Sequence, residues 1–384
     1  MKTVLFVGAG RNQRRAIERV RELGVRVVAV DRNPEAPGLA LADAGEAVDF
    51  SDPYAVAEVG RSHGVDGVMT IAADSAVPVV ARVAELLGLP GIGSAAAHLA
   101  TNKIAMRREF AEHGVPQPRF AAVRTLSEAH AAARTLDFPA VLKPADSAGQ
   151  RGLFLVGSGD ELAAQMALSL AASPSQQAIV EEFHEGREIN TLLVAREDDV
   201  RLVTASDRIR PDGVGFGVAL AHLYPSTLFG DALAEVERVA VAAVRAIGLR
   251  NGIAYPQLLL SPNEHEVRVV EIAARIPGGQ MVEVPRYGVG VDLVEVAVRL
   301  ALGEEVPDEL LAPSFQQSFA IRFLTASPGV LPQPVRPRAR ATRLLCNLVA
   351  ARGSIRHAVS TSISPAAASA RSSASRFVSP SAIT

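Results

Sequence analysis

The stretch FPAVLKPADSAGQRG, residues 138–152, contains Lys143, one of only three lysines in this chain of 384 residues. The other two are Lys2 and Lys103, and the remaining 36 of the 39 basic residues are arginine. Lys143 ends a run that is typical of a β-strand, and a loop of small residues follows it directly. A position that keeps lysine in so arginine-rich a chain indicates a need for a compact, mobile ammonium group rather than a planar guanidinium.

The loop that follows this lysine has the composition of a phosphate-binding loop. Ser147 opens it, and Gln150 and Arg151 stand between Gly149 and Gly152. Backbone N–H groups in such a loop can approach phosphate oxygens closely, because few side chains intervene. Taken alone, the stretch fits a glycine-containing hairpin with an exposed lysine slightly better, so other features must decide.

Composition places the chain among ordinary globular proteins. Apolar residues make up 48% and charged residues 21%, and the length allows more than one domain. A formal net charge of -2 gives no reason to expect nucleic acid or a membrane as partner. The single cysteine, Cys346, excludes an internal disulfide framework and a cysteine-clustered zinc site. The first apolar run fits a strand better than a signal peptide, and residues 291–302 carry too many charges to cross a bilayer, so we expect a cytoplasmic protein.

Patterns typical of strands and of helices alternate over the first hundred residues. Strand patterns cover 3–9, 25–30 and 66–72, and helical patterns cover 13–24 and 75–88. Strands separated by helices predict a parallel sheet. We therefore expect a doubly wound parallel α/β domain over residues 1–100.

The middle of the chain predicts a mixed α+β arrangement. One helix from about residue 94 is expected to end at Gly114, before two prolines. The later strand patterns are 138–144, 152–157, 178–183, 188–195, 252–261 and 267–275, and the helical ones are near 159–172 and 231–247. We assign these segments to one domain, residues 101–335, with a lid at about 115–187.

Residues 336–384 differ in character from everything before them. They contain eight arginines, many serines and alanines, and no Asp, Glu or Lys. This composition predicts a disordered tail, or a segment joined by a reading-frame error. We assign no function to it or to Cys346.

Polar residues at four further places could complete a nucleotide site. Lys103 lies near the start of the helix before the small sheet. Glu181 and Glu188 flank a turn at Gly186, so the segment before the turn can offer backbone groups to a base and the later carboxylate can accept from ribose hydroxyls.

Gln257 and Glu271 lie fourteen residues apart on two strand patterns joined by a turn. Antiparallel pairing would bring both side chains to one face, where their oxygens could bind Mg²⁺. Arg275 follows Glu271 at an even offset, which predicts the same face of the strand.

In this order of motifs, residues 1–330 resemble the ATP-grasp superfamily, in particular its carboxylate–amine ligases. The resemblance implies an ATP-grasp fold made of an α+β lid and an α+β catalytic domain. It implies that Lys103 and Lys143 bind ATP phosphates, and that a loop closes over these phosphates, formed by Ser147, Gly149, Gln150, Arg151 and Gly152. It implies that adenine meets the segment of Glu181, Glu182, Phe183 and His184. Ribose would meet Glu188. It also implies that Gln257 and Glu271 hold Mg²⁺, with Mn²⁺ as an alternative ion, and that Arg275 acts with Lys143 on the transferring phosphoryl group.

Two positions distinguish branches within the superfamily. Gln257 stands where most members have an acid, although the carbamoyl phosphate synthetase branch also uses Gln. Ala273 replaces a common Asn, and EIAAR (271–275) with HLYPS (222–226) resembles the branch that joins amino acids.

The resemblance therefore implies an ATP- and Mg²⁺-dependent ligase that forms an amide or peptide-like bond through an acyl-phosphate. Three alternatives stay open: a carboxylase of the carboxyaminoimidazole ribonucleotide synthetase kind, a nucleotide-binding protein without catalysis, and an NAD-dependent oxidoreductase. The last would use the Gly8-Ala9-Gly10 turn and Asp31, although Gln13 replaces the third glycine of that fingerprint.

The expected partners are a small carboxylate and an amine, with no nucleic acid and no membrane, and homodimers are common in the families concerned. Candidate substrate contacts are Arg208, His222, Arg286, Gly8 and Gly10. Arg210 lies beside Arg208 in a glycine-rich segment where a substrate loop would lie.

Overall fold

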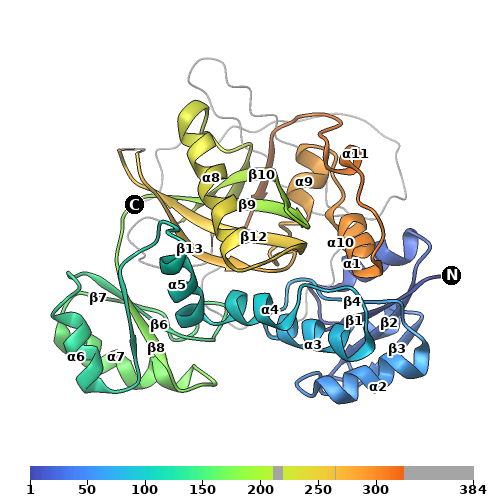
Figure 1. The fold of residues 1–384 in the computed structure, drawn as a ribbon, viewed down its shortest axis with the longest axis horizontal. Coiled ribbons are helices and arrows are strands. Elements are labelled where there is room, and N and C mark those ends of the chain that lie inside the picture. The colour runs from blue at the N-terminus through green and yellow to red at the C-terminus, as the bar shows by residue number, and fades with distance from the viewer. Residues whose placement is uncertain (211–218, 264, 324–384) are drawn as a thin grey trace, which may run out of the picture.

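The computed structural model describes residues 1–210, 219–263 and 265–323 and contains three sheets (Figure 1). The expected irregular tail, residues 336–384, lies outside the described residues, as does segment 211–218 after Arg210. No helix in the described ranges has the length and apolar character that a membrane span requires. The division of the chain at residues 100 and 335 stays a prediction.

The N-terminal sheet is parallel, with strand order β3-β2-β1-β4. Its elements are β1 (Thr3–Val7), α1 (Arg14–Glu22), β2 (Arg26–Asp31), β3 (Ala44–Ala47), α2 (Pro53–His63), β4 (Gly67–Met69) and α3 (Val77–Leu87), with short 3-10 turns at Leu39–Leu41 and Asp74–Ala76. Val4 and Phe6 of β1 belong to the core that holds α1, while Leu5 and Val7 belong to the core of α2 and α3. Alternate residues thus bury both faces, which confirms the doubly wound parallel arrangement.

A helix from far along the chain completes this N-terminal layer. The core that contains Val4 and Phe6 also contains Val294 and Val298 of α10 (Leu293–Leu302). Because α10 contacts β4 and β1, the C-terminal part of the described chain covers one face of the first sheet. Figure 1 shows α10 lying above β1 and β4 at this seam.

A single helix ending at Gly114 was the wrong prediction for the next segment. The structure has two helices, α4 (Ser94–Thr101) and α5 (Lys103–Glu112). Asn102 between them is extended, and its side chain accepts from the N–H of Ala105. Asparagine competes well for such capping positions, so it starts a new helix instead of continuing the old one. Lys103 therefore becomes the first residue of α5.

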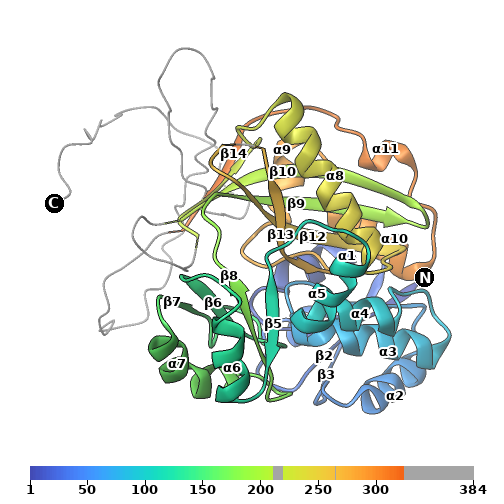
Figure 2. The same ribbon diagram turned by 60° about the vertical axis from the view of Figure 1, so that its left-hand side comes forward.

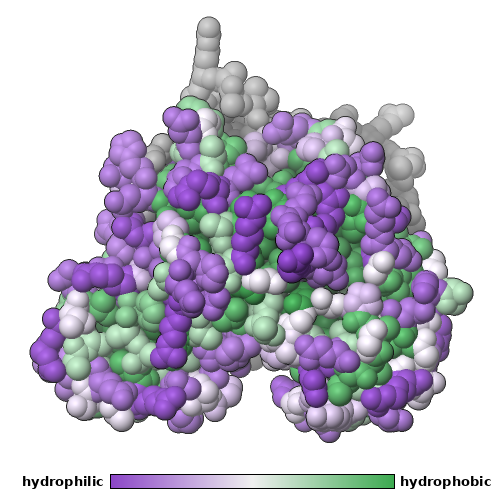
Figure 3. Space-filling view, in the orientation of Figure 1, coloured by the Kyte–Doolittle hydropathy of each residue, from purple (hydrophilic) through white to green (hydrophobic). Residues whose placement is uncertain are grey.

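The second sheet is antiparallel, has the order β5-β8-β6-β7 and lies in a separate lobe (Figure 1). Its elements are β5 (Phe120–Val123), α6 (Leu126–Ala133), β6 (Ala140–Pro144), β7 (Phe154–Val156), α7 (Gly159–Ala171) and β8 (Ala178–Glu182). Leu162 and Met166 of α7 pack on Leu142 and Val180 of the sheet. Figure 3 shows a notch between this lobe and the N-terminal layer at the lower edge of the molecule.

The third sheet has six antiparallel strands in the order β13-β12-β9-β10-β11-β14 (Figure 2). The strands are β9 (Arg187–Arg196), β10 (Asp199–Ile209), β11 (Ala221–Tyr224), β12 (Asn251–Leu260), β13 (Val267–Ala273) and β14 (Phe319–Arg322), and the helices are α8 (Gly230–Ala246), α9 (Glu283–Gly288) and α11 (Asp308–Leu311). Ile189, Leu258 and Ile272 share a core with α8. The residues that alternate with these three, which include most of the predicted site, therefore lie on the face away from α8.

Candidate active site

Three neighbouring strands place polar side chains in one row. Gln257 of β12 pairs in register with Glu271 of β13 on one side and with Asn190 of β9 on the other. Residues directly opposite each other in a sheet share a face, so the expected pairing of Gln257 with Glu271 is found. Glu188 lies two residues before Asn190 and hence on the same face.

Lys143, on β6, is held by a buried carboxylate. Its Nζ lies 2.5 Å from Oε2 of Glu181 on β8. Glu181 is only 1% exposed and also accepts from Nε of Arg107 at 2.8 Å. Burial opposes ionisation of Glu181, but Arg107 and Lys143 outweigh it and lower the pKa of this carboxyl to about 2. The carboxylate is therefore charged at neutral pH and fixes the ammonium group of Lys143.

Arg107 is one residue at this site that sequence reasoning missed. It lies on α5 one turn after Lys103, is fully buried, and donates to the carbonyl oxygens of Val269 (2.9 Å) and Val270 (2.7 Å) as well as to Glu181. One side chain thus joins α5, the lid strand β8 and the strand β13 that carries Glu271. Ile104, Arg107 and Phe110 follow one helical face and are all buried, so an arginine on an apolar stripe was the available signal.

Lys103 holds the loop after β6. Its Nζ donates to the carbonyl oxygen of Ser147 at 2.7 Å, and its backbone N–H donates to the carbonyl oxygen of Ala145 at 2.7 Å. Burial lowers the pKa of Lys103, Glu271 opposes this shift, and Lys143 adds to it. These charges act on one another because β6, α5 and β13 converge at this place.

The loop itself has a left-handed backbone at three positions. Gly149, Gln150 and Gly152 have φ values of +68°, +61° and +72°. A Cβ atom on Gly152 would lie 2.7 Å from Cβ of Ala172, so this position has room only for glycine. The Oγ of Ser147 is buried and has no hydrogen-bond partner among the described residues, while Arg151 donates from Nε to the carbonyl oxygen of Ala148. An unpaired buried hydroxyl on the residue whose carbonyl oxygen binds Lys103 fits a phosphate group.

The segment predicted to meet adenine begins inside the lid sheet. β8 ends at Glu182, whose N–H donates to the carbonyl oxygen of Arg119 and whose carboxylate accepts from the Arg119 side chain. Phe183 and His184 follow the strand end, and burial lowers the pKa of His184. Contact of this segment with adenine stays a prediction.

Arg208 and Arg210 both pair with Glu188, the residue that the family resemblance assigns to ribose binding. Glu188 forms ion pairs with both arginines, and its Oε1 is 2.9 Å from Nε of Arg210. A ribose hydroxyl would therefore meet a carboxylate that is already oriented by two guanidinium groups. Contact of Arg208 with a substrate stays a prediction.

Arg275 lies beyond the end of its strand, contrary to the expected position on the strand face. β13 ends at Ala273, and the chain bends before Arg275. Its Nε and Nη2 donate to the two carboxylate oxygens of Asp74 at 2.8 and 2.6 Å. Asp74 belongs to the turn after β4, so this bidentate pair connects the N-terminal layer to the catalytic sheet. Sequence reasoning missed Asp74 because no local pattern marks it.

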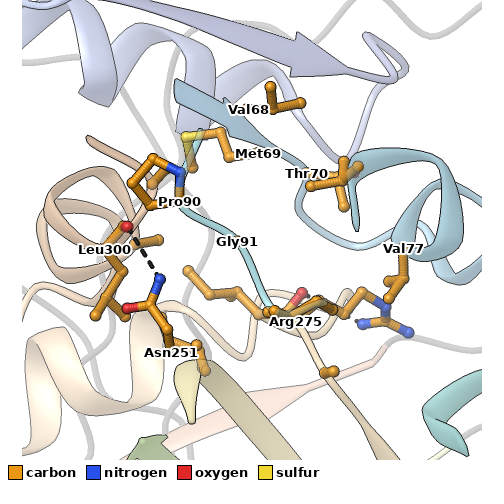
Figure 4. A pocket seen from close by; sticks show the side chains of 17 residues that line it. Val68, Met69, Thr70, Val77, Pro90, Gly91, Asn251, Arg275 and Leu300 are labelled. Carbon is orange, nitrogen blue, oxygen red and sulfur yellow. Dashed lines mark hydrogen bonds between the residues drawn. The ribbon is translucent and has the colours of Figure 1, made fainter. Parts of the chain in front are cut away.

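Arg275 also borders a cavity of about 80 Å³ at the same seam. Figure 4 shows its side chain passing along the cavity with the guanidinium group at the edge near Val77. The walls are mostly apolar, with Met69, Ile253 and Leu300 among them. A space of this size holds a few water molecules and is too small for a nucleotide.

We expect Asp74→Ala to lower the free energy of unfolding by about 1.5–3 kcal/mol, the usual contribution of hydrogen bonds to charged groups. The reason is that a half-buried guanidinium loses its carboxylate at a contact between two layers. Urea denaturation measures the change. Glu58→Ala, which removes an exposed i,i+3 pair with Arg61, is the control and should stay within about 1 kcal/mol of wild type. Equal effects of the two substitutions would contradict the structural importance of the Asp74 pair.

The remaining substrate candidates differ in accessibility. His222 is 6% exposed and contacts Asn190, so it is part of the interior of the site. Arg286 is exposed, with its guanidinium 5.9 Å from the ring centre of Tyr287. Gly8 has a φ of +89°, and a Cβ on Gly10 would lie 3.1 Å from the side chain of Gln13. Both glycines thus form a tight turn, and their contact with substrate stays a prediction.

Asp31 is used by this turn. One carboxylate oxygen accepts from the N–H of Ala9 at 2.7 Å and the other from the N–H of Asn33 at 2.9 Å. Gln13, at the position of the third fingerprint glycine, donates to the carbonyl oxygen of Ile71. These contacts give Asp31 a structural role and give no support to the dinucleotide alternative.

The residues present fit a magnesium ion bound together with nucleotide phosphates. In the described part of the chain no three acidic, histidine or cysteine side chains form a metal cluster. Mg²⁺ commonly uses one or two protein oxygens and completes its shell with phosphate and water. Glu271 and Gln257 on one row supply that number of protein oxygens.

Residues 102–309 match the family described as "Carbamoyl-phosphate synthase L chain, ATP binding domain", and residues 17–91 match "ATP-grasp N-terminal domain". A formate-dependent phosphoribosylglycinamide formyltransferase from Synechococcus sp. is 32% identical over 53% of this chain and 53% of its own length. A protein of the same name from Ignicoccus hospitalis is 28% identical over 81% of this chain and 78% of its own. The chain spans 29% of a carbamoyl phosphate synthase large chain from Rubrobacter xylanophilus, at 26% identity over 79% of this chain.

Solved structures share the fold. L-amino acid ligase from Bacillus licheniformis has a TM-score of 0.75 at 20% identity and covers 90% of this chain and 87% of its own. Phosphoribosylglycinamide synthetase from Anaerococcus prevotii has a TM-score of 0.69 at 22% identity, covering 89% of this chain and 86% of its own. The arrangement of three sheets is therefore that of ATP-grasp proteins.

Proposed function

Because the chain belongs to the ATP-grasp superfamily of enzymes, through its carbamoyl-phosphate synthase-type ATP-binding domain, we propose that it joins a small carboxylic acid to an amine with ATP. The convergence of Lys103, Lys143, Glu271 and the unpaired Ser147 hydroxyl on one site carries this proposal. The chain spans about half the length of the first of its curated relatives. Any statement about which acid and which amine it uses is therefore also a proposal.

In the proposed reaction the acid's carboxylate attacks the γ-phosphorus of ATP and ADP leaves, and the amine then displaces phosphate from the acyl-phosphate. Lys103 and Lys143 are placed to neutralise charge on the phosphate oxygens, and the loop 147–152 to exclude water from the acyl-phosphate. Gln257 and Glu271 would hold Mg²⁺, which when bound neutralises charge on the phosphoryl oxygens. Asp74 orients Arg275 at the seam where the N-terminal layer would present the acid or the amine.

Three kinds of small acid should be screened first. The curated relatives include formate-dependent enzymes, and the structural neighbours include an L-amino acid ligase and N5-carboxyaminoimidazole ribonucleotide synthetases. Formate, bicarbonate and amino acids should therefore be offered with a set of amines, and ADP release followed. Release of ADP only with a matched acid and amine would support a ligase. Tight ATP binding without ADP release from any pair would favour the non-catalytic alternative.

We expect Mg-ATP and Mg-ADP, but not NADH, to raise the unfolding temperature. A ligand at about 100 times its dissociation constant adds roughly 2.7 kcal/mol to the free energy of unfolding. Differential scanning fluorimetry of the full chain measures this shift. Stabilisation by NADH alone would overturn the proposed function, because the Gly8-Ala9-Gly10 turn would then be the cofactor site.

A further inference from the structure

A hydrogen-bonded row leads from the proposed metal ligand Gln257 into the interior. Nε2 of Gln257 donates to Oδ1 of Asn190 at 3.3 Å, and Nδ2 of Asn190 lies 2.9 Å from Nδ1 of His222. Asn190 is 1% exposed and His222 is 6% exposed, so solvent does not compete for these contacts. The three residues lie on β12, β9 and β11.

The order of donors and acceptors along this row decides whether the oxygen or the nitrogen of the Gln257 amide faces a cation. An amide nitrogen has two hydrogens, and both are used, because Nε2 of Gln257 also donates to the hydroxyl oxygen of Tyr255 at 3.2 Å. The amide oxygen of Gln257 is thus left for the side of the site where Glu271 lies. Only that oxygen can bind a metal ion.

The reverse order of donors and acceptors would prevent Gln257 from binding a cation. If Nδ1 of His222 carried the proton, Asn190 would turn its oxygen to His222 and its nitrogen to Gln257. Gln257 would then accept from Asn190 and present an NH₂ group to the cation. Burial, reinforced by Arg208, lowers the pKa of His222 to about 4, so the ring is neutral at pH 7 and Nδ1 is able to accept.

We propose that Asn190 and His222 are positioning residues that hold the amide oxygen of Gln257 toward the metal ion. The inference rests on the proposed function, since it takes Gln257 as a metal ligand. It accounts for how a neutral amide can take the place of a carboxylate: a carboxylate binds with either oxygen, whereas an amide must be oriented from behind.

Asn190→Leu tests this proposal, because leucine is similar in size and cannot accept from Gln257. Binding of Mn²⁺ in the presence of ADP, followed by the loss of free Mn²⁺ signal in electron paramagnetic resonance, is expected to weaken roughly ten- to hundredfold. Thr191→Val is the matched control: Thr191 is also fully buried and also contacts β12, through the carbonyl oxygen of Pro256, but from the opposite face. This control should bind Mn²⁺ like the wild type.

A double substitution separates orientation from general damage to the site. In a Gln257→Glu background either oxygen can bind the metal, so adding Asn190→Leu should cost little Mn²⁺ affinity. The same loss in both backgrounds would overturn the proposal, as would unchanged affinity for Asn190→Leu in the wild-type background. His222→Phe provides a second route to the same test if Asn190→Leu does not fold, and it should weaken Mn²⁺ binding in the same direction. Failure of the wild type to bind Mn²⁺ with ADP would instead contradict the proposed function.

Discussion

Replacing Lys143 with alanine is expected to lower kcat/KM for ATP by about a hundredfold or more, the loss typical of one preorganised donor at a reacting group. Lys143 is half-buried on the rigid strand β6, with its Nζ 2.5 Å from Glu181. Glu181 keeps Arg107 when the lysine is gone, so its buried charge stays compensated and the fold should survive. The loss should therefore appear in catalysis much more than in stability.

Once an acid and an amine are known, initial rates of ADP release over a range of ATP concentrations measure the loss in kcat/KM. Before the substrates are known, titration with Mg-ADP measures the loss in nucleotide affinity. Lys2→Ala is the control among the three lysines, because Lys2 is exposed and pairs with Asp66 at the edge of the N-terminal sheet. Lys143→Arg keeps the charge but replaces a compact ammonium with a planar fork, so we expect only partial activity. Unchanged turnover of Lys143→Ala would sink the assignment of this lysine.

The sequence predicted the parts of the site that depend on local patterns. The Gln257 and Glu271 pairing follows from two strand patterns joined by a short turn, and alternation alone then sets the shared face. The strand that carries Lys143 and the turn at 147–152 could be predicted in the same way, because a strand pattern, a lysine and closely spaced glycines are contiguous. The doubly wound N-terminal layer likewise follows from alternating strand and helix patterns.

The parts that were missed or misplaced depend on distant contacts. Arg107 meets partners 74 and 162 residues away, and Arg275 meets Asp74 at a separation of 201 residues. The coverage of β1 by α10 is equally remote in sequence. Asn102 differs, because its capping property is local, but the helical patterns on either side of it are continuous and concealed the break.

Arg107→Met is expected to lower the free energy of unfolding at pH 7 by about 3–5 kcal/mol, because it removes the fully buried partner of a buried ion pair and leaves Glu181 with Lys143, whose side chain is less buried than that of Arg107. Arg107 is fully buried, and its removal leaves Glu181 with Lys143 as its one ion-pair partner among the described residues. Two backbone carbonyls of β13 also lose their donor. Urea denaturation measures the loss, and Arg108→Met, at the exposed neighbouring position, is the control.

The pKa of Glu181 determines how the effect of Arg107→Met on stability changes with pH. Arg107 and Lys143 depress the pKa of Glu181 from 4.5 to about 2, so the stability that this ion pair contributes is present above pH 4.5 and is lost as the pH falls toward 2. In Arg107→Met the buried carboxyl binds a proton more readily and becomes neutral at a higher pH. The difference in free energy of unfolding between Arg107→Met and the wild type should therefore become smaller as the pH falls below about 4.5.

A second substitution isolates the charge from the packing. Glu181→Gln added to Arg107→Met removes the buried carboxylate that has only Lys143 as its ion-pair partner in the single variant, so the double variant should be more stable at pH 7 than Arg107→Met alone. A double variant that is as unstable as the single one would assign the loss to packing and to the carbonyls of β13. An Arg107→Met variant whose free energy of unfolding lies within about 1 kcal/mol of wild type would mean that Lys143 alone compensates Glu181.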